Sequence, residues 1–177
     1  MPVKVAFIKG DISEQAVDAL VNPSNTDLVM AGGVAAAILK RGGEWIREEC
    51  ERLAPIRLGA ATVTIGGTLR ATYVIHAAVL RHGEKATADS IRQATHQALL
   101  RAEEKAIRSI AFPALGAGTG GVPVEEAAGI VLKVVLDHIK MRTSLESVYF
   151  VLFDDAALKA FEDTYEKLTL RPAIRTR

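Results

Sequence analysis

The sequence predicts an α/β protein, built as a three-layer α/β/α sandwich around a mixed, mostly parallel sheet of about six strands. Three observations support this fold class. Short runs of Val, Ile and Ala alternate with amphipathic segments in the second half of the chain, as in a parallel sheet covered by helices. Glycine-rich turns follow two of these runs. The 177 residues are 49% apolar but only 5% aromatic, so we expect one domain with an aliphatic core.

Strands are expected where β-branched and apolar residues run together or alternate between turn residues. These segments are Val3–Ile8, Val17–Val21, Ala61–Ile65, Tyr73–Val79, Ser109–Leu115 and Ser147–Phe153. Because Pro23 restricts the preceding Asn22 to extended geometry, we expect the second strand to end at that point.

Helices are expected where apolar residues recur every three or four positions. These segments are Val34–Lys40, Glu44–Leu53, Thr87–Ile107, Pro123–Met141 and a last helix, capped by Asp154 or Asp155, that ends near Leu168. We expect residues 1–170 to form a single domain and residues 171–177 to form a basic C-terminal tail.

The charge balance argues against several classes of protein. Lys and Arg number 22 and Asp and Glu 21, which disfavours general electrostatic binding of nucleic acid but permits a local basic patch. A single cysteine, Cys50, excludes an internal disulfide framework. We find no signal peptide and no apolar run of membrane-spanning length. We therefore expect a soluble, cytoplasmic protein that does not associate with membranes.

The run Gly116–Gly121, with the sequence GAGTGG, is the strongest candidate for a binding site. It lies between a predicted buried strand and a predicted helix, an arrangement that holds phosphate with backbone N–H groups and the helix dipole. Ala117, Gly118, Thr119 and Gly120 complete this candidate loop. The alternative is a tight turn that binds nothing, but one glycine would be enough for such a turn.

Ligands of parallel sheets bind beyond the carboxyl ends of the strands. Besides the loop Gly116–Gly121, this rule selects three stretches: Asp11-Ile12, the segment Asn22–Gly33, and Phe153-Asp154. Gly32-Gly33 precedes a predicted helix, so the two glycine clusters together suit two phosphates or one pyrophosphate.

The side chains at these strand ends suit the other parts of a nucleotide. Asn25 could bind sugar hydroxyls, Asp11 could accept from an exocyclic amine such as adenine N6, and Phe153 could stack on a base. Each residue also has a simpler interpretation: Asp11 as a turn residue, Asn25 in an Asx-turn, and Phe153 in the core. Their common location favours the functional interpretation.

Four stretches of the chain, taken together, resemble a macro domain, the ADP-ribose-binding module. The stretches are GDIS at residues 10–13, VDALVNPSN at 17–25, AGGVAAAI at 31–38 and SIAFPALGAGTGGVP at 109–123. Their spacing also fits, and the resemblance extends over nearly the whole chain.

The resemblance implies a ligand and a role for each candidate residue. ADP-ribose, or an ADP-ribosylated macromolecule, would be the partner. Asp11 and the Ile12 backbone would bind adenine, on which Phe153 would stack. Asn25, Gly32, Gly33 and the adjoining Val34 would hold the distal ribose, and the loop Gly116–Gly121 would wrap the pyrophosphate.

Two departures from the family pattern leave hydrolysis open. Many hydrolytic macro domains carry an acid directly after Gly-Gly-Val and a histidine four positions later, where this chain has Ala35 and Leu39. Neither can activate water. The aromatic residue usual in the second glycine loop is replaced by Gly120. The resemblance thus predicts ADP-ribose binding, with weak or no hydrolysis of ADP-ribose derivatives.

Other functions fit the sequence less well. A reader of poly(ADP-ribose) or RNA without catalysis is the main alternative, because an adenine and pyrophosphate site could take a chain end. A nicotinamide-dependent oxidoreductase would use the G-x-G-x-x-G of Gly116, Gly118 and Gly121, but that loop comes late in the chain and lacks the acidic partner at the usual spacing. No Lys-Ser or Lys-Thr follows the loop, which disfavours a nucleotide triphosphatase.

The four histidines show no spacing typical of a metal site, so we expect no metal and no cofactor. His76 lies within an apolar strand, and we expect a core histidine with a hydrogen-bonded ring. We expect Arg41, Arg47 and Arg52 to form a solvated helix face.

Overall fold

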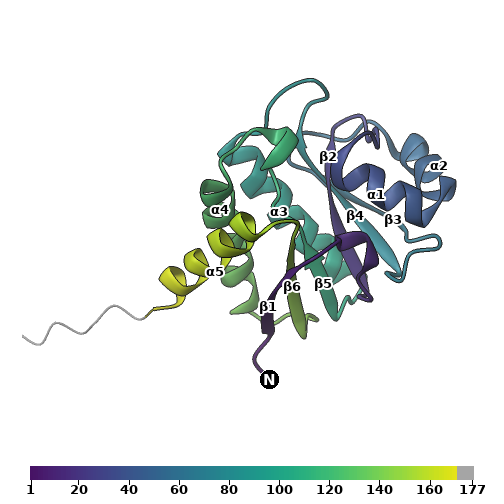
Figure 1. Ribbon diagram of the computed structural model, residues 1–177. Helices are drawn as coiled ribbons and strands as arrows, with labels where there is room; N and C mark the ends of the chain where they lie inside the picture. The colour runs from purple at the N-terminus through teal and green to yellow at the C-terminus, as the bar shows by residue number, and fades with distance from the viewer. Residues whose placement is uncertain (171–177) are drawn as a thin grey trace, which may run out of the picture.

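The computed structural model describes residues 1–170, and it has the predicted three-layer architecture. One six-stranded sheet, in the order β1-β6-β5-β2-β4-β3, lies between two groups of helices (Figure 1). Every neighbouring pair is parallel except β3 and β4. The tail predicted at residues 171–177 lies outside the described residues.

Predicted and observed elements agree closely. The strands are β1 (Lys4–Lys9), β2 (Ala19–Asn25), β3 (Ala61–Ile65), β4 (Tyr73–Leu80), β5 (Ser109–Phe112) and β6 (Ser147–Leu152). The helices are α1 (Gly33–Gly42), α2 (Glu44–Leu53), α3 (Ala88–Glu104), α4 (Val124–Ile139) and α5 (Asp155–Thr169). Two short 3-10 turns, η1 (Ile12–Glu14) and η2 (Gly118–Gly120), are additions that the sequence patterns did not predict.

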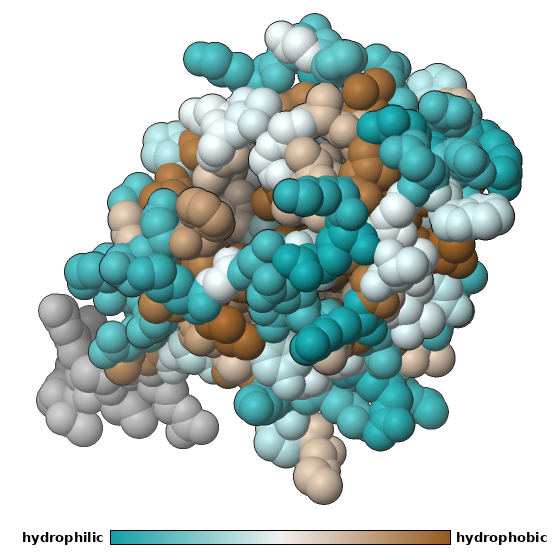
Figure 2. Space-filling model, turned by 45° about the vertical axis from the view of Figure 1, so that its right-hand side comes forward, coloured by the Kyte–Doolittle hydropathy of each residue, from teal (hydrophilic) through white to brown (hydrophobic). Residues whose placement is uncertain are grey.

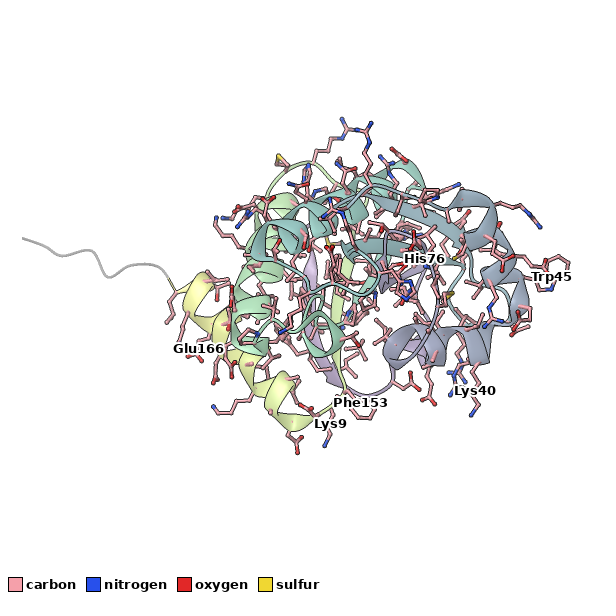
Figure 3. All side chains as sticks on the ribbon, turned by 90° about the horizontal axis from the view of Figure 1, so that it is seen from above. Lys9, Lys40, Trp45, His76, Phe153 and Glu166 are labelled. Atoms are coloured by element: carbon pink, nitrogen blue, oxygen red, sulfur yellow. The ribbon has the colours of Figure 1, made fainter. Side chains whose placement is uncertain are left out.

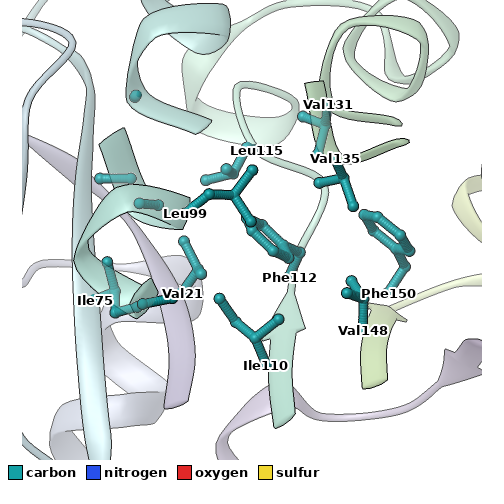
Figure 4. Packing of buried hydrophobic residues seen from close by; sticks show 14 of the residues in the cluster. Val21, Ile75, Leu99, Ile110, Phe112, Leu115, Val131, Val135, Val148 and Phe150 are labelled. Carbon is teal, nitrogen blue, oxygen red and sulfur yellow. The ribbon is translucent and has the colours of Figure 1, made fainter. Parts of the chain in front are cut away.

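The two faces of the sheet bury separate cores, because successive side chains of a strand point to opposite faces. In β2, Val21 packs with the helices α3, α4 and α5, whereas Leu20 packs with α1 and α2. The first core is the larger. Its aromatic centre is Phe150, whose ring centroid lies 5.8 Å from that of Phe112 (Figure 4) and 5.5 Å from that of Phe161.

The surface carries scattered apolar groups. On the face in Figure 2, hydrophilic side chains cover most of the surface and hydrophobic residues show as separate brown groups. Within residues 1–170, no helix has the length and apolar character needed to cross a membrane.

The predicted end of β2 was wrong. The strand continues through Pro23 to Asn25, pairing with β4 up to a register shift between Ser24 and Asn25. The extended geometry that proline imposes on Asn22 is itself strand geometry. In addition, β5 pairs with β2 only at Ala19 and Leu20, so the proline lies where the strand has one neighbour, as strand prolines usually do. The strand ends of β5 and β6 were predicted three residues and one residue too late.

His76 is a core histidine, as predicted. Its ring is fully buried on β4, with Nδ1 3.1 Å from Asn22 Nδ2 and Nε2 2.8 Å from Thr64 Oγ1. Burial lowers the pKa of His76 from 6.5 to about 4, so the ring is neutral at pH 7. The thiol of Cys50 lies 3.7 Å from Nε2. Burial, and then the charges of Glu49 and Glu51, raise the pKa of that thiol to about 11.

The buried His76 should make stability fall with acid. The folded protein resists protonation of this ring until about pH 4, whereas the unfolded chain takes up the proton near pH 6.5. The contribution is therefore complete above pH 6.5 and is lost as the pH falls from 6.5 towards 4; it amounts to roughly 3 kcal/mol. Urea unfolding of the wild-type protein between pH 7 and pH 4.5 measures this slope.

The variant His76→Gln should lose that part of the slope. His96→Gln, which removes an exposed histidine of α3, is the matched control and should keep the wild-type slope. Equal slopes for the wild-type protein and His76→Gln would contradict the assignment.

Candidate functional site

Four neighbouring strands bring the predicted site residues to one edge of the sheet. The parallel strands β1, β6, β5 and β2 lie side by side in that order. Asp11 follows β1, Phe153 follows β6, the loop Gly116–Gly121 comes after β5, and Asn25 ends β2. With strands ~4.8 Å apart, this row extends over about 14 Å between β1 and β2. The candidates therefore form one elongated site at the carboxyl ends of the strands.

Asp11 is placed by the 3-10 turn that it caps. Its Oδ1 accepts hydrogen bonds from the backbone N–H of Ser13 (2.9 Å) and from the Ser13 hydroxyl (2.6 Å). Ile12 is the first residue of η1, so its N–H has no partner within the turn. Asp11 is thus a turn residue. Its second carboxylate oxygen, Oδ2, and the adjacent backbone N–H of Ile12 make no hydrogen bond within the turn.

Phe153 projects from the end of β6 instead of joining the core. Its side chain is 87% exposed, which excludes the core interpretation. The register pairs Lys9 with Leu152, and Figure 3 shows Phe153 beside Lys9 at this edge. Lys9 is held by an ion pair with Asp155 at 2.9 Å. An exposed aromatic ring therefore lies next to the strand end that carries Asp11.

The first glycine cluster leaves the start of α1 open. Gly32 and Gly33 have φ angles of +71° and +54°, and a Cβ on either would meet no atom within 4 Å. Gly32 is the N-cap residue and has no side chain, and no side chain among residues 1–170 makes a capping hydrogen bond to the first N–H groups of α1. Val34 follows as a half-buried residue of the first turn. This helix end can accept an anion or a polar group.

Asn25 is used mainly by its own loop. Its Oδ1 accepts from the N–H of Asp27 (3.0 Å) and of Val29 (3.2 Å), and its Nδ2 donates to Val29 O (3.0 Å). The bond to Asp27 makes an Asx-turn, the simpler interpretation considered for the sequence. These bonds brace a loop in which Leu28 has a left-handed φ of +54°. One N–H of Nδ2 remains for a ligand.

The second glycine loop contains two kinds of glycine. A Cβ at Gly116 would lie 2.1 Å from Ile91 Cδ1, so this glycine allows close packing on α3. Gly120 is buried, and its carbonyl accepts from Ala86 N–H (3.0 Å). Gly118, by contrast, is exposed, has φ +65° and has no atom within 4 Å of a Cβ position.

The rest of this loop sets its shape. Ala117 is half-buried and Thr119 is exposed. Gly121 has φ +76°, and a Cβ there would lie 3.3 Å from Lys85 Cδ. The loop is closed by the hydrogen bond from Val122 N–H to Gly116 O (3.1 Å). Helix α4 begins only at Val124, so the loop's own backbone, centred on Gly118, forms the open surface.

A depression of about 400 Å³ lies beside Asp11 and is lined by Asp11, Ser13, Ala37, Lys40 and Arg41. Apart from Asp11, sequence reasoning did not assign these residues to the site. Arg41 is exposed, as predicted, but it lies on α1 whereas Arg47 and Arg52 lie on α2. Its guanidinium also donates to Glu14 (2.8 Å) and to the Ser13 hydroxyl (3.2 Å). Ala37 could have been found from its position four residues after Gly33, one helical turn from the open helix end. No sequence signal linked Arg41 to Ser13.

The site carries no acid–histidine pair on α1. Ala35 is buried and packs with the second core, where Leu39 also packs. Among residues 1–170, no three His, Cys, Asp or Glu side chains gather closely enough to hold a metal ion.

Comparison with known proteins identifies the fold and the family. The sequence model of the Macro domain matches residues 21–131. The chain is 39% identical over 174 residues to a macro domain-containing protein of Caldanaerobacter subterraneus, and the match covers 95% of this chain and 99% of that protein. The chain belongs to the macro-domain family.

Other relatives are longer. The chain is also 39% identical to an uncharacterized protein of Thermotoga maritima, but it covers only 28% of that protein's length. It is 40% identical to an uncharacterized protein of Mycobacterium bovis and covers 44% of its length.

Solved structures share the fold. The macrodomain of Oceanobacillus iheyensis with ADP superposes with a TM-score of 0.84 at 23% identity, over 92% of this chain and 90% of that one. The macrodomain of Trypanosoma brucei in complex with ADP-ribose gives a TM-score of 0.83 at 29% identity, over 90% of this chain and 68% of that one. The α/β architecture is therefore that of macrodomains.

The two kinds of glycine in the second loop should respond differently to alanine. Gly118→Ala should cost about 1 kcal/mol, from the left-handed backbone alone. Gly116→Ala should cost at least about 1 kcal/mol more, because its methyl group also displaces the buried Ile91. Urea unfolding measures both. Gly129→Ala in α4, where no atom lies within 4 Å of a Cβ, is the control and should stabilise by up to ~1 kcal/mol. Equal losses of unfolding free energy in Gly116→Ala and Gly118→Ala would refute the distinction between a packed and an open glycine.

Proposed function

We propose that this protein binds ADP-ribose along the carboxyl edge of its sheet. The observation that carries the proposal is the order of the groups along β1, β6, β5 and β2. A carboxylate and an exposed ring come first, an open glycine loop follows, and an asparagine with a second open glycine pair comes last. ADP-ribose has the same order: adenine, its ribose, a diphosphate and a second ribose.

Adenine binds at the β1 and β6 end in this proposal. Its exocyclic amine donates to Asp11 Oδ2, and a ring nitrogen accepts from the free N–H of Ile12. The ring stacks on Phe153, which otherwise exposes a large apolar surface to water. Asp11, Ile12 and Phe153 would therefore contact the amine, a ring nitrogen and the face of the same base.

The diphosphate binds between the two glycine clusters. Gly118 leaves space for phosphate oxygens to approach the backbone, and the open start of α1 at Gly33 adds N–H groups and the positive end of a helix dipole. The distal ribose then lies at the β2 end, where Asn25 has one N–H to donate. The T. brucei macrodomain, solved with ADP-ribose and with ADP, supports this choice of ligand.

The proposal is binding and not efficient hydrolysis, because α1 carries Ala35 and Leu39 where hydrolytic relatives have an acid and a histidine. The attached group of an ADP-ribosylated macromolecule would extend from the β2 end. A poly(ADP-ribose) or RNA reader, like a cytoplasmic location, remains an expectation from the sequence. Salt separates these ligands: binding of poly(A) through many phosphates would weaken steeply as salt rises, whereas ADP-ribose has only two.

Calorimetry with ADP-ribose, ADP, NAD and poly(A) tests the ligand, and Asp11→Asn tests the adenine contact. Asparagine still caps η1, but it replaces the charged acceptor. Loss of a hydrogen bond to a charged group costs ~1.5–3 kcal/mol, so the variant should bind ADP-ribose about tenfold more weakly or worse. Asp27→Asn, which removes an exposed acid at the same sheet edge, is the charge-matched control and should bind normally. Unchanged affinity in Asp11→Asn would exclude this adenine site.

Gly118→Val should abolish binding, because the side chain fills the space given to the phosphates and strains a left-handed residue. Thermal melting reports binding and stability together. At a hundredfold excess over Kd, a ligand adds about 2.7 kcal/mol to stability, which raises the wild-type Tm. The variant should show no such rise.

Gly83→Val is the matched control for this variant. Gly83 also has a left-handed φ (+84°) and open space at its Cβ position, but it belongs to the loop after β4. This variant should suffer similar backbone strain and keep the ligand-induced rise in Tm. A full ligand shift in Gly118→Val would show that the phosphates bind elsewhere.

A further inference from the structure

The two oxygens of the Asp11 carboxylate have different surroundings. Oδ1 is occupied by two hydrogen bonds from Ser13. Oδ2 accepts no hydrogen bond from residues 1–170, and its ion-pair partner, Arg41 Nη2, is 3.9 Å away, beyond hydrogen-bonding distance. The carboxylate therefore presents one free acceptor, provided that it does not rotate.

Ser13 fixes that rotation with two donors to Oδ1: its backbone N–H, which η1 holds in place, and its hydroxyl, which reaches Asp11 only in the observed side-chain rotamer. The side chain is buried at 1% exposure, and its oxygen lies 2.6 Å from Asp11 Oδ1 and 3.2 Å from Arg41 Nε. A guanidinium N–H can only donate. Arg41 therefore occupies a lone pair of Ser13 Oγ, and the hydroxyl directs its single proton to Asp11. The two hydrogen bonds therefore point the same way: Arg41 donates to Ser13, and Ser13 donates to Asp11.

Arg41 is itself held in place. Its Nη2 donates to Glu14 Oε1 at 2.8 Å, so the planar fork contacts two residues of η1 at once. The residue lies in the last turn of α1, whose first turn carries the open Gly33. One helix thus connects the glycine cluster proposed for the phosphates with the turn that carries Asp11.

We propose that Arg41 is a positioning residue that orients the Asp11 carboxylate and thereby sets a preference for a 6-aminopurine over a 6-oxopurine. The proposal rests on the proposed binding of ADP-ribose. A 6-amino group donates to the fixed Oδ2, whereas a 6-oxo group places a second acceptor against it. Without Arg41, the Ser13 side chain is free to leave the rotamer that reaches Asp11, and the carboxylate, held only by the backbone N–H of Ser13, rotates about its broad terminal torsion. The preference for the 6-aminopurine over the 6-oxopurine then falls, while the stacking and phosphate contacts, which both nucleotides make, persist.

Calorimetry with ADP-ribose and with its hypoxanthine analogue tests this role through the ratio of the two affinities. The wild-type protein should prefer ADP-ribose by about tenfold or more. Arg41→Ala should lower that ratio at least about threefold, and the affinity for the analogue should stay within about twofold of wild type. Arg41→Lys should behave like Arg41→Ala, because an ammonium group lacks the fork that reaches Glu14 and Ser13 together.

Two further variants make the result decisive. Ser13→Ala removes the relay while Arg41 remains, and it should lower the ratio in the same way. Arg47→Ala, which removes an exposed arginine of α2 paired with Glu44, should leave the ratio unchanged. A wild-type ratio in Arg41→Ala, or its recovery in Arg41→Lys, would overturn the positioning role while ADP-ribose binding stands. If the wild-type protein binds neither nucleotide, the proposed function fails, and this inference fails with it.

Discussion

The parallel pairing of β1 with β6 fixes the position of every group at the adenine end of the candidate site. Lys9 pairs with Leu152, and Gly10 N–H donates to Leu152 O at 2.9 Å, so Asp11 and Phe153 leave adjacent strands at the same level. A slip of one residue would exchange the faces of the strand and expose its buried side chains. Burial of Val151 and Leu152 on opposite faces of β6 therefore also holds the relative positions of the carboxylate and the ring.

The two glycine loops at this edge of the sheet are held in shape in different ways. The second loop packs against Ile91 of α3 at Gly116 and against Ala86, in the loop before α3, at Gly120; among its first five residues only Gly118 and Thr119 are exposed. The first loop is braced instead by the side chain of Asn25, which makes three hydrogen bonds across residues 25–29. One loop is shaped by missing side chains and the other by a single side chain. Both leave backbone open at the edge of the sheet.

Most of the fold and much of the candidate site could be predicted from local sequence. Hydrophobic periodicity located the six strands and five helices of residues 1–170, because each element buries one face or both. The sequence also offered two candidate caps for each of two helices, and the structure uses Thr87 for α3 and Asp154, over Asp155, for α5. The end of β2 was predicted wrongly because the position of Pro23 in the sheet depends on the short length of β5, which is a long-range property. The contact between Arg41 and Ser13 joins residues 28 positions apart, and no local pattern encodes it. Asn25 shows the same limit, since its type suits both a turn and a ligand.

Helix α1 also acts as a spacer. From Gly33 to Arg41 it rises by about 12 Å, close to the ~14 Å between β1 and β2 across the sheet edge. A deletion or insertion of one residue within α1 would rotate the helix by ~100° and turn either its glycine end or its arginine away from the edge. Lys85 and Ala86, in the loop after β4, contact the second glycine loop, but a Cβ at Gly83 in the tip of that loop would meet no described atom within 4 Å. Among proteins that keep this site, the length of α1 should therefore vary far less than the length of the segment between Leu80 and Lys85.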